Sequence, residues 1–201
     1  MAAFSRTQLQ QMKLGIFGGS FDPVHLGHLM VAQSAMEELD LDRLFFVPAA
    51  QSPFKPDSRP APASVRLQML RMACASRPDY EVDAQEIMRG GVSYTIDTVR
   101  DFAHRFPGAG LFYLIGADHV AKLPLWREAK DLARMAEFVV IPRPGEEVSA
   151  FPEPFRGRAL AGFPFAVSSS QIRERVKAGL RIDHLVPAPV VEVIRNNGLY
   201  L

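Results

Sequence analysis

The hydrophobic positions along the chain fall into short, almost wholly apolar runs of four or five residues. Runs of this kind are typical of strands that are buried on both faces, as in a parallel sheet. The clear examples are residues 14–17, 44–47, 111–115 and 138–141. The pattern therefore predicts four buried strands, with residues 80–82 as a weaker fifth candidate.

Amphipathic segments lie between these runs, with apolar side chains at helical spacing. They predict helices over about residues 25–39, 65–73, 94–106 and 190–194. Ser64 should cap the second helix, the Pro-Gly pair at 107–108 should stop the third, and Asn-Asn-Gly at 196–198 should end the last. Because strand and helix alternate, we expect an α/β fold: one Rossmann-like, doubly wound parallel sheet with helices on both faces.

Two proline-rich stretches interrupt the alternation. Residues 48–63 and residues 142–164 each hold five prolines, which disfavours regular structure over most of their length. We interpret the second as an excursion that returns to the sheet at residues 166–167, and the first as a candidate lid over a binding site. Residues 13–201 should form a single domain, after a short polar lead-in at 1–12 that is a candidate for disorder.

Composition narrows the classes of function. The 201 residues are 48% hydrophobic, enough for one full core, and the formal net charge is +1. That charge gives no general attraction to nucleic acid or to an anionic membrane, so neither is expected as a partner. No apolar stretch approaches the ~20 residues of a membrane span. Cys74 is the single cysteine, so we expect no internal disulfide, a buried thiol and a cytoplasmic protein.

The first predicted strand leads directly into a glycine pair and a helix start. Gly18 and Gly19 would let the backbone turn sharply and approach a ligand. Pro23 suits the first turn of a helix, so the helix should begin near residue 24. Its free N–H groups and its dipole would then face the space above the strand ends, which favours a phosphate ligand.

A pair of histidines follows in that helix. His25 and His28 are three residues apart, so we expect them on one face of the first turn, with Gly27 leaving room for a bulky ligand. Two alternatives remain at this point: exposed histidines at an ordinary helix start, or ligands of a metal ion, for which only Asp22 stands nearby. The place of the pair, directly after the strand and the glycines, favours phosphate chemistry.

A second polar segment follows residues 166–167. Ser168, Ser169 and Ser170 stand at a predicted helix start, with Arg173 in its first turn. Hydroxyls, free backbone N–H groups and a guanidinium fork all bind phosphate oxygens. Taken alone, however, the segment fits an ordinary serine-capped helix with solvated arginines better.

The two segments together resemble a known superfamily. Residues 18–28 resemble the G-x-F-D-P-x-H-x-G-H signature of the nucleotidyltransferases related to class I aminoacyl-tRNA synthetases. Residues 167–173 resemble the I-S-S-T-x-I-R motif of the same superfamily, with Val167 for Ile and Ser170 for Thr. The resemblance implies that both segments hold the phosphates of ATP.

Further segments are similar to the bacterial nicotinate mononucleotide adenylyltransferases. They are residues 91–98, 114–118, 123–126, 140–145, 185–187 and 198–200. This resemblance implies adenylyl transfer from ATP to nicotinate mononucleotide, which gives deamido-NAD and pyrophosphate in NAD biosynthesis. Two alternatives stay open: an adenylyltransferase for nicotinamide mononucleotide or phosphopantetheine, and a non-catalytic nucleotide-binding regulator.

The resemblance also implies a role for each candidate site residue. The catalytic residues would be His25, His28 and Arg173. The ATP site would add Gly18, Gly19, Ser20, Phe21, Gly116, Asp118, Ser168, Ser169 and Ser170. The mononucleotide would be held by Lys55, Thr95, Trp126 and Arg143. ATP and nicotinate mononucleotide are the expected partners, with Mg²⁺ entering as Mg-ATP and no dedicated protein metal site. The sequence leaves open whether the protein is a monomer or a homo-oligomer.

Several of these residues have a structural alternative. Trp126 could stack on a pyridine ring or pack in the core, and Asp118 could hold ribose hydroxyls or cap a helix. The family usually has P-P-H-K where this chain has Ser-Pro-Phe-Lys at 52–55. Lys55 keeps a cation there, but no histidine role can be transferred to Phe54. Arg143 could instead be a solvated loop arginine. Three nearby residues are candidates on polarity alone: Gln51, Arg59 and Arg66. The remaining histidines are expected to be structural or surface residues: His104, His119 and His184.

Overall fold

The fold is built on a parallel sheet of six strands. The computed structural model describes residues 12–54, 59–141 and 149–201. In this part of the chain the strand order is β3-β2-β1-β4-β5-β6, and every neighbouring pair is parallel. The strands are β1 (Lys13–Gly19), β2 (Arg43–Pro48), β3 (Tyr80–Val82), β4 (Gly110–Gly116), β5 (Glu137–Ile141) and β6 (Gly157–Ala159). The four strands expected from the apolar runs, and the weaker candidate at residues 80–82, are confirmed.

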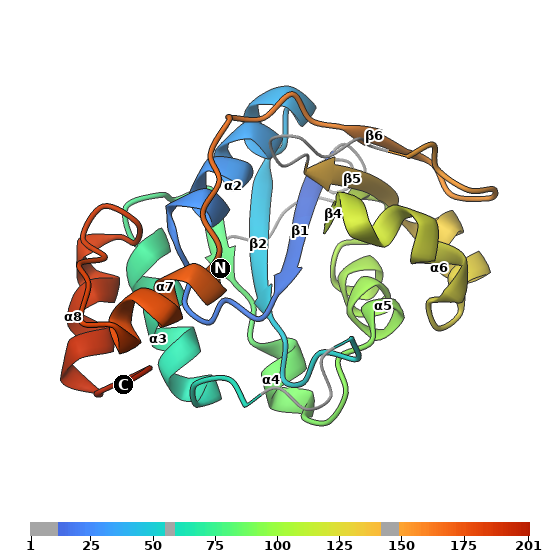
Figure 1. Ribbon diagram of the computed structural model, residues 1–201. Coiled ribbons are helices and arrows are strands. Elements are labelled where there is room, and N and C mark those ends of the chain that lie inside the picture. The colour runs from blue at the N-terminus through green and yellow to red at the C-terminus, as the bar shows by residue number, and fades with distance from the viewer. Residues whose placement is uncertain (1–11, 55–58, 142–148) are drawn as a thin grey trace.

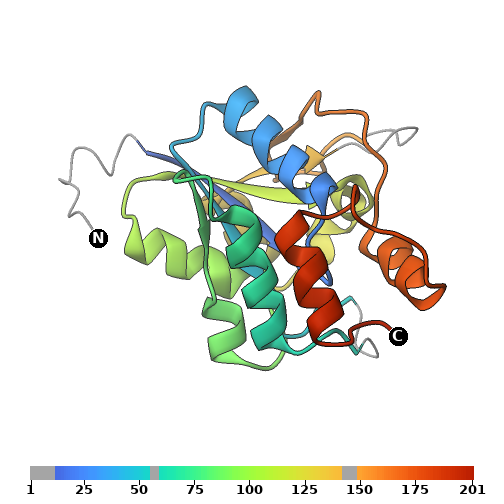
Figure 2. The ribbon, with the colours of Figure 1, turned by 90° about the vertical axis from the view of Figure 1, so that its left-hand side faces the viewer.

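Helices cover both faces of the sheet, as a doubly wound fold requires (Figure 1). One face carries α2 (Leu26–Leu39), α3 (Ala63–Cys74), α7 (Ser169–Lys177) and α8 (Ala188–Asn196). The other face carries α5 (Thr95–Arg105), the 3-10 helix η1 (Ala117–Leu125) and α6 (Ala129–Met135). The short helix α4 (Gln85–Arg89) follows β3. Figure 2 shows α2, α3 and α8 aligned across the first face.

The strands are apolar throughout because they are buried from both sides. In β2, Leu44 and Phe46 pack into the core beneath α2 and α3. The alternate residues Phe45 and Val47 pack into the core beneath α5 and η1. Successive strand side chains point to opposite faces, so each central strand contributes to two cores.

Three local expectations were wrong. Helix α3 begins at Ala63 with Pro62 at its N-cap position, so Ser64 lies inside the helix and does not cap it. Residues 166–167 are not a strand; the sixth strand is β6, inside the proline-rich excursion. Met12, assigned to the lead-in, is buried against the core, while residues 1–11 lie outside the described part of the chain. By contrast, α5 and α8 end where the Pro-Gly and Asn-Asn-Gly signals predicted.

Cys74 closes α3 and is buried, as expected. Burial raises the pKa of its thiol to about 12. A thiolate, the reactive form, is therefore strongly disfavoured in the folded protein, which supports a packing role. Within the described residues every helix falls short of the length and apolarity that a membrane span requires.

A buried arginine ties the ends of the central strands to α3. Arg66 is only 1% exposed. Its Nε donates to the carbonyl of Ala61 at 3.0 Å, and its NH1 donates to the carbonyls of Ser20 and Ala49 at 2.8 and 2.9 Å. Burial lowers the pKa of Arg66, and the nearby Asp22 carboxylate opposes that shift. Arg66 therefore has a structural role. It satisfies the carbonyls of residues just after β1, just after β2 and just before α3.

We expect Arg66→Met to lower the free energy of unfolding by about 3 kcal/mol, because three part-buried carbonyls lose their donor. The matched control is Arg71→Met, an exposed arginine on the same helix, which should change stability by less than about 0.5 kcal/mol. Urea unfolding followed by circular dichroism measures both. A loss below about 1 kcal/mol for Arg66→Met would contradict the assigned role.

Candidate active site

A cavity of about 870 Å³ opens at the carboxyl ends of β1 and β4. The chain leaves β1 towards β2 and β3 on one side and continues from β4 towards β5 and β6 on the other. Ligands of open α/β sheets bind at such a switch point. Ser20 after β1 and Gly116 at the end of β4 line the cavity, together with the starts of α2 and α7.

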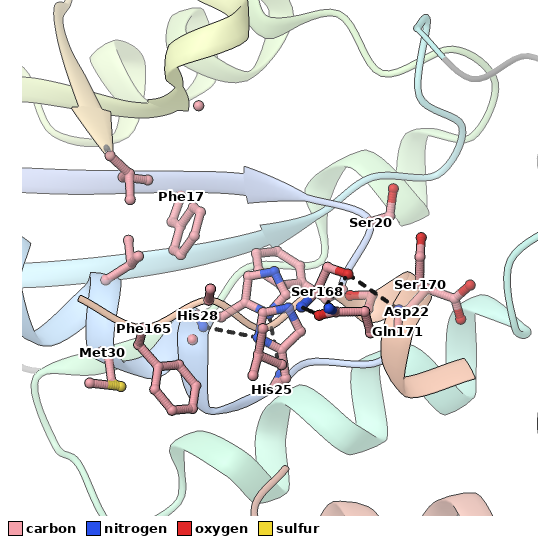
Figure 3. A pocket seen from close by; sticks show the side chains of 18 of the residues that line it. Phe17, Ser20, Asp22, His25, His28, Met30, Phe165, Ser168, Ser170 and Gln171 are labelled. Atoms are coloured by element: carbon pink, nitrogen blue, oxygen red, sulfur yellow. Dashed lines mark hydrogen bonds between the residues drawn. The ribbon is translucent and has the colours of Figure 1, made fainter. Parts of the chain in front are cut away.

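The histidine pair forms the start of α2 in an unexpected way. Helix α2 begins at Leu26, so His25 is its N-cap and His28 its third residue. The Nδ1 of His25 accepts from the backbone N–H of His28 at 3.3 Å, and the Nδ1 of His28 accepts from the N–H of His25 at 3.2 Å. The rings stack with centroids 3.7 Å apart (Figure 3). The helix therefore begins slightly later than expected, with His25 as its cap, while the expected placement of both histidines on one face is confirmed.

This reciprocal cap determines which ring nitrogen of each histidine acts as an acceptor. A neutral imidazole carries its proton on one nitrogen and accepts on the other. Because each Nδ1 accepts a backbone hydrogen bond, each ring in its neutral form carries its proton on Nε2. Both histidines and the positive end of the α2 dipole border one cavity, an arrangement suited to an anion.

The glycines around the histidines are needed for close packing. A Cβ on Gly18 would lie 2.4 Å from the Tyr113 hydroxyl oxygen. A Cβ on Gly27 would lie 3.0 Å from Nδ1 of His25 and 3.5 Å from the carbonyl oxygen of Val167. Gly27 lines the cavity beside the His25 ring, so its expected part in leaving room for a ligand stays a prediction.

The sharp turn after β1 also differs from expectation. Gly18 and Gly19 lie within the strand, and the left-handed residue is Phe21, with φ 46°. The Phe21 ring is buried and packs edge-on against the His28 ring at 4.9 Å between centroids. Of these residues, Phe21 lines the cavity, whereas Gly18 packs beside Tyr113 and Gly19 beside the Phe21 ring.

The start of α7 meets the start of α2 across the cavity. Ser168 is the N-cap of α7 and forms a capping box with Gln171. The Ser169 hydroxyl donates to the Pro23 carbonyl at 2.9 Å. Arg173 donates from NH1 to the Asp22 carbonyl at 2.8 Å and from NH2 to the Ser170 hydroxyl at 3.1 Å. The serine-cap alternative is correct for Ser168, and the structure nevertheless brings all three serines and Arg173 to the cavity.

The cavity has a polar end and an apolar end. Figure 3 shows Ser20 and Ser170 towards one end, Met30 and Phe165 towards the other, and the histidines between them. Leu160 and Phe163 also line it. Sequence reasoning missed the apolar end, although aromatic residues in a proline-rich excursion were a signal that the segment covers something.

Two of the residues expected at the mononucleotide, Thr95 and Trp126, do not line this cavity. Trp126 packs near Phe54 and His119, with ring centroids 5.7 and 5.8 Å away, and against the core residue Phe138 at 6.0 Å. Its Nε1 is buried and has no hydrogen-bond partner among the described residues. Trp126 therefore combines core packing with a place in an aromatic cluster. His119, expected to be structural or at the surface, belongs to the same cluster.

The remaining candidate residues lie in several parts of the fold. Thr95 begins α5, and its hydroxyl lies 3.5 Å from that of Tyr113. Asp118 lies in the first turn of η1, is exposed, and makes no capping hydrogen bond, so its helix-cap alternative was wrong. Arg59 lines the large cavity, and Gln51 forms an isolated bridge with Val92. Lys55 and Arg143 lie outside the described residues. His104 and His184 are exposed, as expected.

A doubly wound parallel sheet with two helix starts facing one cavity at its switch point defines a Rossmann-like nucleotidyltransferase fold. The family model described as cytidylyltransferase-like matches residues 16–175. A nicotinic acid mononucleotide adenylyltransferase of Plasmodium falciparum, solved in complex with NaAD, superposes with a TM-score of 0.77 over 94% of this chain and 97% of that one, at 19% identity.

Sequence relatives narrow the class. The probable nicotinate-nucleotide adenylyltransferase of Opitutus terrae is 42% identical over 191 residues, which cover 94% of this chain and 98% of the relative. The nicotinate-nucleotide adenylyltransferase of Bacillus subtilis is 39% identical over 189 residues, with the same shares of 94% and 98%. The chain belongs to the nicotinate-nucleotide adenylyltransferase family.

We expect Gly27→Ala to reduce turnover at least ~10-fold with little change in melting temperature. The added Cβ would displace the His25 ring from its stack, and small misplacements at a reacting centre are costly. The control is Gly110→Ala, whose nearest heavy atom would be an ordinary 3.6 Å away. Initial rates and differential scanning fluorimetry measure both variants; equal rates for the two would contradict the role assigned to Gly27.

Proposed function

We propose that this protein transfers the adenylyl group of ATP to nicotinate mononucleotide, forming deamido-NAD and pyrophosphate in NAD biosynthesis. The observation that carries the proposal is the identity of 39–42% with nicotinate-nucleotide adenylyltransferases over nearly the whole chain. The stacked histidines and the α7 start, which face one cavity, supply the groups that this reaction needs.

The chemistry requires positioning more than proton removal. An oxygen of the acceptor's 5′-phosphate attacks the α-phosphorus of ATP, a new P–O bond forms, and the bond to the β-phosphate bridging oxygen breaks in line. The attacking oxygen is already anionic, so no strong general base is required. Negative charge spreads over the equatorial and leaving oxygens, and donors aimed at those oxygens lower the barrier.

The geometry suggests a role for each donor. The Nε2–H groups of His25 and His28 would donate to the α-phosphate as its charge develops. Ser170 and Arg173 would hold the departing pyrophosphate. The Ser169 hydroxyl already donates to Pro23, so Ser169 would contribute its backbone N–H at the start of α7.

The two ends of the cavity orient the nucleotide. The apolar end at Met30, Phe163 and Phe165 suits a flat purine ring, and the polar end suits the phosphates. Gly116 lines the cavity at the end of β4, where ribose hydroxyls are often held, and Asp118 would be the nearby acceptor for them. On the acceptor side, Trp126 would stack on the pyridine ring and Thr95 would bind its acid group. Lys55 and Arg143 would hold the acceptor phosphate.

Mg²⁺ would enter with ATP. Among the described residues that line the cavity, Asp22 is the only carboxylate, and its Oδ1 already accepts from the Tyr200 hydroxyl and the Ala61 N–H. This donor set fits an ion held mainly by phosphates and water, as Mg²⁺ commonly is with nucleotides. The ion would neutralise part of the charge on the polyphosphate.

We expect His28→Ala to lower kcat by ~10²–10³-fold, the scale of losing one transition-state donor. The variant also loses half of the α2 cap, so its free energy of unfolding should fall by ~1 kcal/mol. His184→Ala removes an exposed imidazole and is the control. Rates of pyrophosphate release are compared at a temperature where both variants are folded; a kcat within a few-fold of wild type excludes the proposed role.

The acceptor is tested directly by incubating the protein with ATP, Mg²⁺ and either nicotinate mononucleotide, nicotinamide mononucleotide or phosphopantetheine. We expect pyrophosphate release to be fastest with the nicotinate compound, because an acid group can accept hydrogen bonds at the start of α5. Faster release with another acceptor would reassign the substrate. No release with any of them would favour a nucleotide-binding regulator.

A further inference from the structure

One buried carboxylate joins four distant parts of the chain beside the phosphate end of the cavity. Asp22 follows β1 and is 7% exposed. Its Oδ1 accepts from the Tyr200 hydroxyl at 2.7 Å and from the Ala61 N–H at 3.1 Å. Its Oδ2 lies 3.8 Å from NH1 of Arg173. Tyr200 lies beyond α8, in a segment that turns back towards α7 (Figure 1).

At this junction the Tyr200 hydroxyl is the donor and the Asp22 carboxylate is the acceptor. Burial, reinforced by the neighbouring Asp22 carboxylate, raises the pKa of Tyr200. The phenol therefore keeps its proton and remains a donor to Asp22. A carboxylate that accepts from two fixed donors on one oxygen has a fixed orientation, and its second oxygen then faces the Arg173 guanidinium.

Arg173 depends on this junction for its direction. Its NH1 donates to the Asp22 backbone carbonyl at 2.8 Å, and its NH2 donates to the Ser170 hydroxyl at 3.1 Å. The arginine side chain is otherwise long and adaptable, and 38% of its surface is exposed. Contacts on both sides restrict it to the rim of the cavity, which is a large entropic advantage for a group that must meet a polyphosphate.

We propose that Tyr200 is a positioning residue for phosphate binding, which acts through Asp22 to hold Arg173 in its phosphate-facing conformation. The inference rests on the proposed function, because it takes Arg173 as the residue that holds the polyphosphate. Tyr200 does not line the cavity, so any effect of its hydroxyl on nucleotide binding must pass through Asp22 and its partners.

Tyr200→Phe removes only the hydroxyl and keeps the ring, which packs against the core. The matched control is Tyr80→Phe: the Tyr80 hydroxyl is buried in the same core and has no hydrogen-bond partner among the described residues. Arg173→Ala and the double variant Tyr200→Phe/Arg173→Ala complete a cycle that measures whether the two residues act together.

Two readouts are taken for each variant, alongside its melting temperature. The first is the Kd for α,β-methylene ATP with Mg²⁺, measured by titration calorimetry, which needs no acceptor. The second is kcat and KM with ATP and nicotinate mononucleotide. We expect Tyr200→Phe to raise the Kd and lower kcat by ~10-fold each, with KM for the mononucleotide within ~3-fold of wild type. Tyr80→Phe should leave all of them within ~2-fold.

The cycle separates a positioning role from a general loss of stability. In the Arg173→Ala background, Tyr200→Phe should add less than ~2-fold, because the residue it positions is gone. Equal effects in the two backgrounds, or a Tyr200→Phe variant that behaves like Tyr80→Phe, overturn the inference. Absence of pyrophosphate release by the wild-type protein would instead overturn the proposed acceptor, while the Kd comparison still decides the role of Tyr200.

Discussion

The reversal of strand order between β1 and β4 is the constraint on which the site depends. Every crossover in a parallel sheet must pass over one face, and the right-handed twist fixes which face. The first half of the chain therefore places α2 and α3 on one face, and the following segments place α5, η1 and α6 on the other. No helix can lie over the carboxyl ends where the two directions diverge, so a crevice remains there. The late return of α7 to the first face then brings a second helix start to that crevice, and Ser169 reaches Pro23 across 146 positions of sequence.

The central strands could be predicted from sequence because burial on both faces leaves an unbroken apolar run. β6 could not, because Gly157, Arg158 and Ala159 form a short edge strand whose side chains are largely outside the core. The opposite error occurred at residues 166–167: they are apolar because they lie along the cavity wall, and no strand pairs with them. An apolar run indicates only that its side chains are covered. Whether a neighbouring strand or a cavity lies beside the run depends on the rest of the fold.

The same reasoning explains how much of the site could be predicted. The groups proposed to bind phosphate lie in two continuous segments, so their residue types and spacing indicated them. Their exact geometry did not follow, because an imidazole is an unusual N-cap and nothing in the spacing reveals that two rings cap one another. Contacts between distant segments were missed: the apolar end of the cavity, the place of His119 beside Phe54 and Trp126, and the junction at Asp22. Each of these depends on which segments the fold brings together.

The Asp22–Tyr200 hydrogen bond, which spans 178 positions, also bears on when the protein can begin to work. Contacts between residues so far apart form late, since the intervening chain must first be ordered. During synthesis the histidine pair and most of the sheet emerge well before residue 200, although a domain generally folds as one unit. Until residue 200 is in place, the Asp22 carboxylate lacks the hydroxyl that orients it. The junction beside the cavity is therefore complete only when the chain has been made through residue 200.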